Sequence, residues 1–181
     1  MTDPLYFDND CISAFLWVRE ERFLVALYPG RIIVPQQVYN EISLVPHLKT
    51  RLDAQIAAGS ITTCSIAIGS PAAVLYNKLA YAPDEGRAII GRGEASVIAL
   101  AFVNGGTVAS NNIRDVAAYV SELGLRHSTT SDILVEAYNR TIITEADGNI
   151  LWQKMLAKKR KLGAASFSDY LAAHADRDEL K

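Results

Sequence analysis

Four acidic side chains stand near the ends of predicted strands or the starts of predicted helices. The clearest is Asp8, because the apolar run Leu5–Phe7 stops abruptly at it, as a buried parallel strand does when it delivers an acid to its C-terminal tip. An acid in such a place can also simply cap the next helix or interact with its dipole. The two interpretations differ in whether the acids meet. The four acids are Asp8, Glu41, Glu94 and Asp115.

Carboxylates that cluster repel one another, so they stay ionised only when a cation balances them. Oxygen ligands without histidine or cysteine favour Mg²⁺ or Mn²⁺, and the three histidines here are scattered without zinc spacing. Such ions are commonly shared with substrate phosphates. The chemistry indicated is metal-assisted phosphoester hydrolysis. Cys11 and Cys64 are predicted to be small core residues rather than a disulfide or a thiolate site.

The elements that must position these acids alternate between strand and helix, which predicts an α/β doubly wound sheet. Turns from strand to helix in such a fold lie on one edge, so the acids are expected to meet there. Asn9 and Asp10 are interpreted as a turn and an N-cap before a helix from Cys11. The predicted strands are 5–7, 31–34, 61–65, 107–109 and 125–128, and the main predicted helices are 11–18, 20–28, 36–43, 46–58, 72–81, 94–102, 113–123 and 133–139.

The C-terminal part is predicted to be helical. An amphipathic helix is expected over 145–162, with the basic run Lys158–Lys161 at its end, followed by a short helix capped by Ser166 or Ser168. Such a basic run is usually a solvated helix face, although it can also contact nucleic acid or a partner. We expect residues 1–144 to form the main domain and 145–181 to be a helical extension packed on it.

Composition limits the function classes. The chain has 181 residues, of which 50% are hydrophobic and 21% charged, which favours one folded domain over a disordered or membrane-spanning chain. The N-terminus, with Asp3 and no basic stretch, does not resemble a signal peptide, which favours the cytoplasm. A net charge of −2 does not indicate a nucleic-acid binder, but a local patch or a bound cation could supply the attraction.

The chain resembles the PIN-domain nucleases, in particular the VapC-like toxins of toxin–antitoxin pairs. The resemblance implies a three-layer α/β/α fold with a central, mostly parallel sheet, and a metal-dependent ribonuclease. It implies catalytic Asp8, Glu41, Glu94 and Asp115, of which Asp8, Glu94 and Asp115 hold Mg²⁺ or Mn²⁺, with RNA as substrate, an antitoxin protein as a partner and a homodimer. The similar segments are 7–10, 34–41, 93–101 and 109–115, in the family's order and spacing.

One departure from the family concerns Asn111 and Asn112, where many members carry two aspartates. Other members have Asn followed three residues later by Asp, which Asn112 and Asp115 satisfy. If the first pattern applies, the site has lost acids and attracts a metal less strongly. Further candidate site positions are Asp10, Asn111, Asn112, Thr129 and Asp132, and the candidates for phosphate binding are Arg92 and Arg114, with Arg87 and Arg126 as alternatives.

Three other interpretations stay open from sequence. The motif at residues 8–10 also resembles the first motif of haloacid-dehalogenase-like phosphatases, but the paired acids and the lysine which that class needs later are not evident. A PIN-like module that has weakened into a protein- or RNA-binding role would explain Asn111 and Asn112. The acids could also be helix caps of an unrelated α/β protein.

Overall fold

A single parallel sheet organises the structure, a computed structural model that describes residues 3–178, and side chains as far as residue 174. Its five strands lie in the order β3-β2-β1-β4-β5, and every neighbouring pair is parallel. The predicted α/β fold with a central parallel sheet is therefore confirmed. The strands are β1 (Leu5–Phe7), β2 (Ile32–Pro35), β3 (Ile61–Cys64), β4 (Thr107–Ala109) and β5 (Arg126–Ser128).

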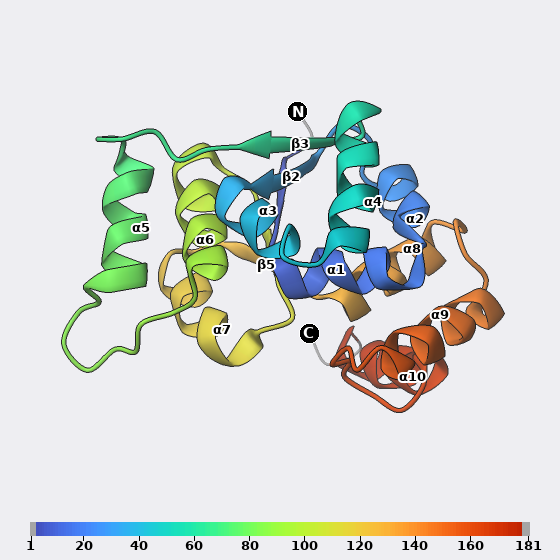
Figure 1. The fold of residues 1–181 in the computed structure, drawn as a ribbon. Helices are drawn as coiled ribbons and strands as arrows, with labels where there is room; N and C mark the ends of the chain where they lie inside the picture. The colour runs from blue at the N-terminus through green and yellow to red at the C-terminus, as the bar shows by residue number, and fades with distance from the viewer. Residues whose placement is uncertain (1–2, 179–181) are drawn as a thin grey trace.

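Helices lie on both sides of this sheet. Figure 1 shows α6 and α7 to its left, with α5 outside α6, and α2, α4 and α8 to its right. Within residues 3–178, no helix combines the length and the apolar character needed to cross a membrane. The helices are α1 (Asn9–Val18), α2 (Glu21–Leu27), α3 (Gln36–Ile42), α4 (Pro46–Ala57), α5 (Pro71–Tyr81), α6 (Arg92–Asn104), α7 (Ile113–Glu122), α8 (Thr130–Asn139), α9 (Glu145–Ala157) and α10 (Phe167–Asp178).

Strand β1 is the centre of the sheet and has buried side chains throughout. Its neighbours β2 and β4 are reached by crossovers that run in opposite directions, so the C-terminal end of β1 is a switch point, where open α/β sheets bind ligands. Phe7 lies opposite Ala109 in the register. The next residues, Asp8 and Ser110, therefore leave the sheet side by side.

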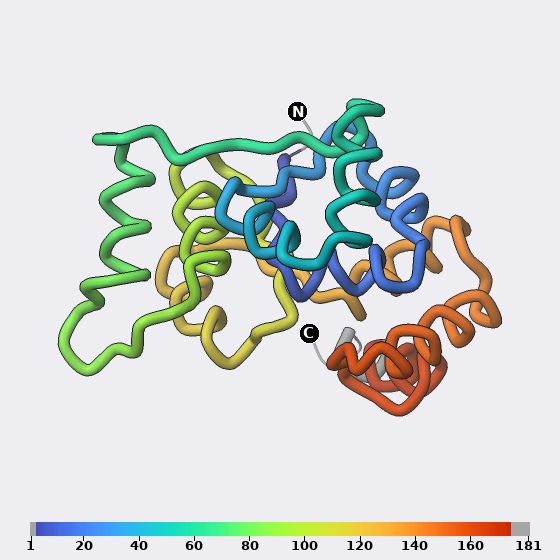
Figure 2. The backbone as a smooth tube through the Cα atoms, viewed as in Figure 1, coloured from blue at the N-terminus to red at the C-terminus, as the bar shows by residue number. Residues whose placement is uncertain are grey.

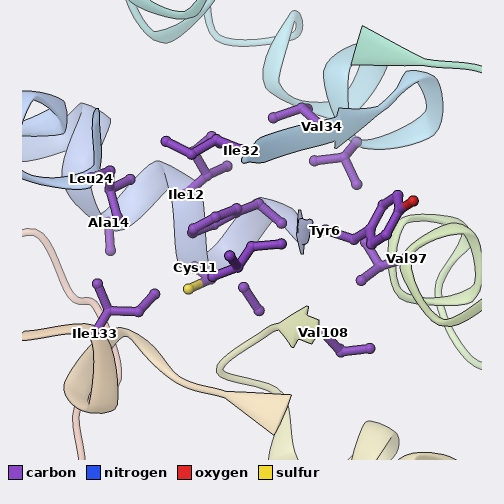
Figure 3. Packing of buried hydrophobic residues seen from close by; sticks show 14 of the residues in the cluster. Tyr6, Cys11, Ile12, Ala14, Leu24, Ile32, Val34, Val97, Val108 and Ile133 are labelled. Carbon is purple, nitrogen blue, oxygen red and sulfur yellow. The ribbon is translucent and has the colours of Figure 1, made fainter. Parts of the chain in front are cut away.

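The core fills the space between the sheet and its helices. Figure 3 shows side chains of β1, β2 and β4 packed with Ile12 from α1 and Val97 from α6. Ile12 and Val97 are both fully buried. The apolar run at the start of α6 thus explains why that helix lies against the sheet and brings its N-terminal residues to the edge where β1 ends.

Helix α1 begins two residues earlier than the sequence pattern predicted. Asp8, rather than Asp10, is its N-cap, and the Asp8 carboxylate accepts a hydrogen bond from the backbone N–H of Asn9. Helix α8 likewise begins at Thr130, with Thr129 as its N-cap, instead of at Ile133. In both places the cap is the first polar residue after the strand, and the polar residues that follow are already helical.

The prediction of one helix over 145–162 was wrong, because α9 ends at Ala157. Lys159 adopts a left-handed conformation with φ 58°, and the N–H groups of Lys159 and Arg160 bond back to the carbonyls of Leu156 and Met155. These bonds form a Schellman motif, which ends a helix and satisfies its last carbonyls. The basic run Lys158–Lys161 therefore follows the helix rather than forming its last turn.

The two C-terminal helices pack on the rest of the fold. Helix α9 contacts α1 and α8, and α10 contacts α9 and α8; Figure 2 shows this pair in orange and red beside the far end of α1. Phe167 is fully buried, and Ser166 caps α10 by accepting a hydrogen bond from the N–H of Asp169. The division of the chain at residue 144 stays a prediction.

Candidate acidic site

Asp8 lies at the bottom of a small hollow at the C-terminal end of β1. Its side chain is buried, with 3% exposed. One oxygen accepts the hydrogen bond from the N–H of Asn9 at 2.7 Å, and the other accepts from the hydroxyl of Ser110 at 3.1 Å. The cap therefore uses one oxygen of the carboxylate, and the switch point places the group at the edge where open α/β sheets bind ligands.

Asp10 lies in the first turn of α1 and is tied to the end of β4. Its carboxylate accepts a hydrogen bond from the N–H of Asn111 at 3.1 Å. The Asn111 side chain in turn donates to the hydroxyl of Thr130 at 2.9 Å and accepts from the Thr130 N–H at 2.8 Å. Asn111 is thus committed to joining β4, α1 and α8, which is a structural task.

Glu41 reaches the same hollow from the last turn of α3. It accepts hydrogen bonds from the side chain of Asn9 at 3.3 Å and from the N–H of Gly93 at 3.1 Å. Gly93 leaves little room for a side chain, because a Cβ there would lie 3.0 Å from oxygens of both Asp8 and Glu41. The glycine before Glu94 therefore lets the start of α6 approach these carboxylates closely.

Glu94 and Asp115 are joined through an amide. The side chain of Asn112 donates to Glu94 at 3.1 Å and to Asp115 at 2.8 Å. Glu94 lines the hollow around Asp8, but Asp115 is exposed and lines a neighbouring, wider cleft instead. Asn112 is the N-cap residue of α7, but its side chain makes no capping hydrogen bond. It acts as a link between two acids.

The acids in the hollow repel one another. Burial raises the pKa of Asp8 well above its usual range, and the charges of Asp10 and Glu94 raise it further. Burial also raises the pKa values of Asp10 and Glu41, with Glu94 again adding to the effect. A cation placed among these groups would reverse this trend, since it favours the charged form of every carboxylate near it.

The hollow has a volume of about 180 Å³. Within residues 3–174, no group of three acidic, histidine or cysteine side chains converges as a ready-made metal site. Mg²⁺ does not need one, because it usually takes one or two carboxylates and completes its shell with water and substrate phosphates. The oxygen donors around Asp8 fit that mode of binding. The lining residues are Asp8, Asn9, Asp10, Ser13, Glu41, Glu94 and Arg160.

Two of the further candidate residues serve the fold. Thr129 and Asp132 form a capping box at the start of α8, with each side chain bonded to the other residue's backbone. The second oxygen of Asp132 accepts a hydrogen bond from the hydroxyl of Tyr170 at 2.8 Å. Asp132 therefore faces α10, and it is not among the residues that line the hollow.

Of the four arginines named from sequence, only Arg114 lies on the rim of the wider cleft. Arg92 extends over the ring of Tyr81, Arg87 pairs with Glu122, and Arg126 pairs with Asp3. The arginine that does line the hollow is Arg160. Sequence reasoning missed it because the basic run was placed within a helix far along the chain. The signal for it in the sequence was that a basic run, although usually a solvated helix face, can also contact nucleic acid or a partner.

Comparison with known proteins adds no family. The chain matches no family model, and no curated protein sequence is significantly similar to it.

Proposed function

We propose that this chain is a metal-dependent ribonuclease that hydrolyses RNA phosphodiester bonds at the hollow around Asp8. The observation that carries the proposal is the buried Asp8 carboxylate, with Asp10, Glu41 and Glu94 lining the same hollow at the switch point of a parallel sheet. Capping accounts for the position of Asp8. It does not account for three further acids brought beside it, each with its own electrostatic cost.

The chain's own residues would hold the ion and orient the substrate. Asp8 and Glu94 are the first candidates for direct ligands, and Glu41 is fixed by Gly93 and Asn9 so that it can orient a water. Mg²⁺ or Mn²⁺, when bound, would polarise the scissile phosphate and lower the pKa of a water. Asp115, linked through Asn112, would lie at the entrance, where it can contribute charge.

The resemblance to VapC-like toxins supplies the finer part of the proposal. It implies a toxin that is held by an antitoxin protein and that forms a homodimer. A cytoplasmic location is a further part of the proposal. A phosphatase of the haloacid-dehalogenase type is less well supported, because that chemistry needs a lysine beside the acids and none is among the residues that line the hollow.

The test is cleavage of a mixed RNA pool with Mg²⁺ or Mn²⁺ by the natural chain, Asp8→Asn and Asp115→Asn. We expect metal-dependent cleavage that Asp8→Asn abolishes, because Asn still caps α1 but carries no charge for the ion. Asp115→Asn should reduce cleavage only partly, since Asp115 is exposed and lies outside the hollow. A folded natural chain that cuts no RNA with either metal would refute the proposal.

A second candidate function is a PIN-like module that binds RNA or protein without cleavage. The observation that favours it is the Asn112 amide, which already satisfies Glu94 and Asp115 without a metal. Such a module would bind RNA equally well with Mg²⁺ and with EDTA, and neither Mg²⁺ nor Mn²⁺ would raise its unfolding temperature.

A further inference from the structure

A wide cleft adjoins the acidic hollow, and a run of basic side chains lines part of it. It encloses about 760 Å³, which is within the roughly 300–1,000 Å³ of typical ligand sites. Asp10, Arg114 and Asp115 line one part of the cleft, and the basic segment Lys159–Lys161 lines another. The basic run after α9 therefore lines the same cleft as residues that follow β1 and β4, although about 150 residues separate it from Asp8 in the sequence.

Arg160 connects the cleft with the hollow, because it lines both. Its side chain is partly buried. The guanidinium donates through Nε to the carbonyl of Lys158 at 3.1 Å, and its Nη1 lies 3.5 Å from the hydroxyl of Ser13 on α1. These contacts hold the guanidinium in place and leave further N–H donors for an anion, since a guanidinium carries five.

These cations are not used to balance the neighbouring acids. Across the part of the chain that the structure describes, Lys159, Arg160 and Lys161 form no ion pair within 4.0 Å. Lys158, in contrast, turns away and lies over the ring of Trp17 at 5.8 Å. Three consecutive cations thus point toward the cleft and one does not.

A nucleic-acid strand needs such cations here. The acids of the hollow and the net charge of −2 repel phosphates, and a metal in the hollow would attract only the phosphates next to it. Arginine binds phosphate oxygens with two parallel hydrogen bonds, and lysine adds a mobile positive charge. Phosphate contacts position a strand without reading its sequence.

We propose that Lys159, Arg160 and Lys161 bind the phosphates of the RNA strand next to the scissile one, so that the segment after α9 is one wall of the substrate groove. Arg160 binds the phosphate closest to the acids, and the two lysines bind those farther along the cleft. The inference rests on the proposed ribonuclease function and assigns a substrate-binding task to the C-terminal extension.

The experiment measures binding of a short, fluorescein-labelled single-stranded RNA by anisotropy over a series of salt concentrations. Ca²⁺ replaces Mg²⁺ in these measurements, because it binds oxygen ligands with a looser geometry. The variants are Arg160→Gln and the triple variant Lys159→Gln/Arg160→Gln/Lys161→Gln. Lys158→Gln is the matched control, since it removes the same charge from the same segment but outside the cleft. Thermal unfolding of each variant verifies that it is folded.

We expect the triple variant to bind RNA about tenfold or more weakly, and the salt dependence of log K to lose a slope of about 2, because each phosphate contact on a single strand contributes about 0.7. Lys158→Gln should leave the slope unchanged. Arg160→Lys should restore part of the affinity lost in Arg160→Gln, since it keeps the charge but not the paired hydrogen bonds.

Equal affinity and salt slope for the natural chain and the folded triple variant would overturn the inference, whether or not the natural chain cleaves RNA. Loss of binding in the triple variant, with no cleavage by the natural chain under any metal, would support this groove and refute the ribonuclease. The two failures are therefore distinguishable. A loss of RNA affinity in Lys158→Gln as large as that in Arg160→Gln would also overturn the inference, because the effect would then come from overall charge.

Discussion

The backbone N–H of Gly93 donates a hydrogen bond of 3.1 Å to the carboxylate of Glu41. This bond joins the first turn of α6 to the last turn of α3, two helices that are far apart in the sequence. It forms because residue 93 has no side chain, since a Cβ there would lie 3.0 Å from both oxygens of Glu41 and from one oxygen of Asp8. Gly93 thereby lets the start of α6 approach the carboxylates of Asp8 and Glu41 closely.

Gly93→Ala should damage the site more than the fold. A helical Gly→Ala change ordinarily stabilises by about 0.5–1 kcal/mol, but here the new methyl group has to displace the Glu41 carboxylate, which can swing away. We expect the free energy of unfolding to change by less than about 1 kcal/mol, and metal-dependent cleavage to fall about tenfold or more. Chemical denaturation and RNA cleavage rates provide the two measurements.

Glu41→Gln provides the control for that experiment. If Gly93→Ala acts through Glu41, the double variant will cleave no more slowly than the slower single variant, because neighbouring residues in one network are not additive. Fully additive losses would show that the methyl group acts on Asp8 or on the backbone of α6 instead.

Asp8→Asn should stabilise the metal-free protein at neutral pH. Burial and the neighbouring acids raise the pKa of Asp8 above its unfolded value of 3.8, so the folded state takes up a proton between the two pKa values. The free energy of unfolding therefore falls as the pH rises from the unfolded to the folded pKa of Asp8, and it stays lower at higher pH. Because Asn caps α1 as well as Asp does, the variant should unfold at least about 2–4 °C higher at neutral pH.

The measurement is the unfolding temperature of both proteins in EDTA from about pH 4 to pH 8. The natural chain should lose stability over this range relative to Asp8→Asn, and the two curves should converge at the acidic end, where Asp8 is protonated. Adding Mg²⁺ at neutral pH should stabilise the natural chain more than the variant. Parallel curves would show that Asp8 is not destabilised by its surroundings.

Asp132→Ala is expected to weaken the fold and leave the site intact. The variant loses the capping box of α8 and the hydrogen bond from the hydroxyl of Tyr170, which should cost about 1–2 kcal/mol of unfolding free energy. Burial raises the pKa of Asp132, but hydrogen bonds from Thr129 and Tyr170 outweigh it and hold the pKa below its usual range. The stability that Asp132 contributes is therefore present above its unfolded pKa of 3.8 and is lost as the pH falls through the lower folded pKa.

Denaturation at neutral and acidic pH tests this expectation, and the Mg²⁺ dependence of cleavage provides the independent readout. The natural chain and Asp132→Ala should differ most at neutral pH and should need the same Mg²⁺ concentration for half-maximal cleavage. A large rise in that concentration for the variant would return Asp132 to the list of metal-site residues.

The sequence predicted the frame of the site because strand ends and helix starts have clear local signals. The apolar run that stops at Asp8 and the family-like segment 93–101 that contains Glu94 identified two groups that line the hollow. The rule that parallel strands end at one edge then predicted that Glu41 would join them. The sequence could not show that Asn111 and Asn112 have different tasks, because the two side chains have the same chemistry. In the structure, the Asn111 side chain bonds to α8 and the Asn112 side chain bonds to Glu94.

The end of α9 shows the other limit of sequence reasoning. The predicted helix over 145–162 would end just before Gly163, and glycine adopts a left-handed conformation easily. The structure uses Lys159 for this task, with φ 58°, and tertiary packing rather than local propensity decides the position. The early ending turns Arg160 toward α1, and no local pattern encodes that contact.

PIN-domain nucleases, which the sequence resembles, often carry acids at the positions of Asn111 and Asn112. Asn112→Asp replaces an amide that donates to both Glu94 and Asp115 with a third negative charge between them. The metal-free protein should lose about 1–2 kcal/mol of stability, because like charges then face one another. The added carboxylate should tighten metal binding, so half-maximal cleavage should occur at about tenfold lower Mg²⁺.

Asn111→Asp is the matched control, because it adds the same charge one residue away. Asn111 is committed to Asp10 and Thr130, so the change breaks a partly buried network and should cost about 1–3 kcal/mol without tightening metal binding. Calorimetric titration with Mn²⁺ and chemical denaturation separate the two variants. If metal binding became tighter in Asn111→Asp, or did not become tighter in Asn112→Asp, the ion would lie on the side of Asp10 rather than between Asp8 and Glu94.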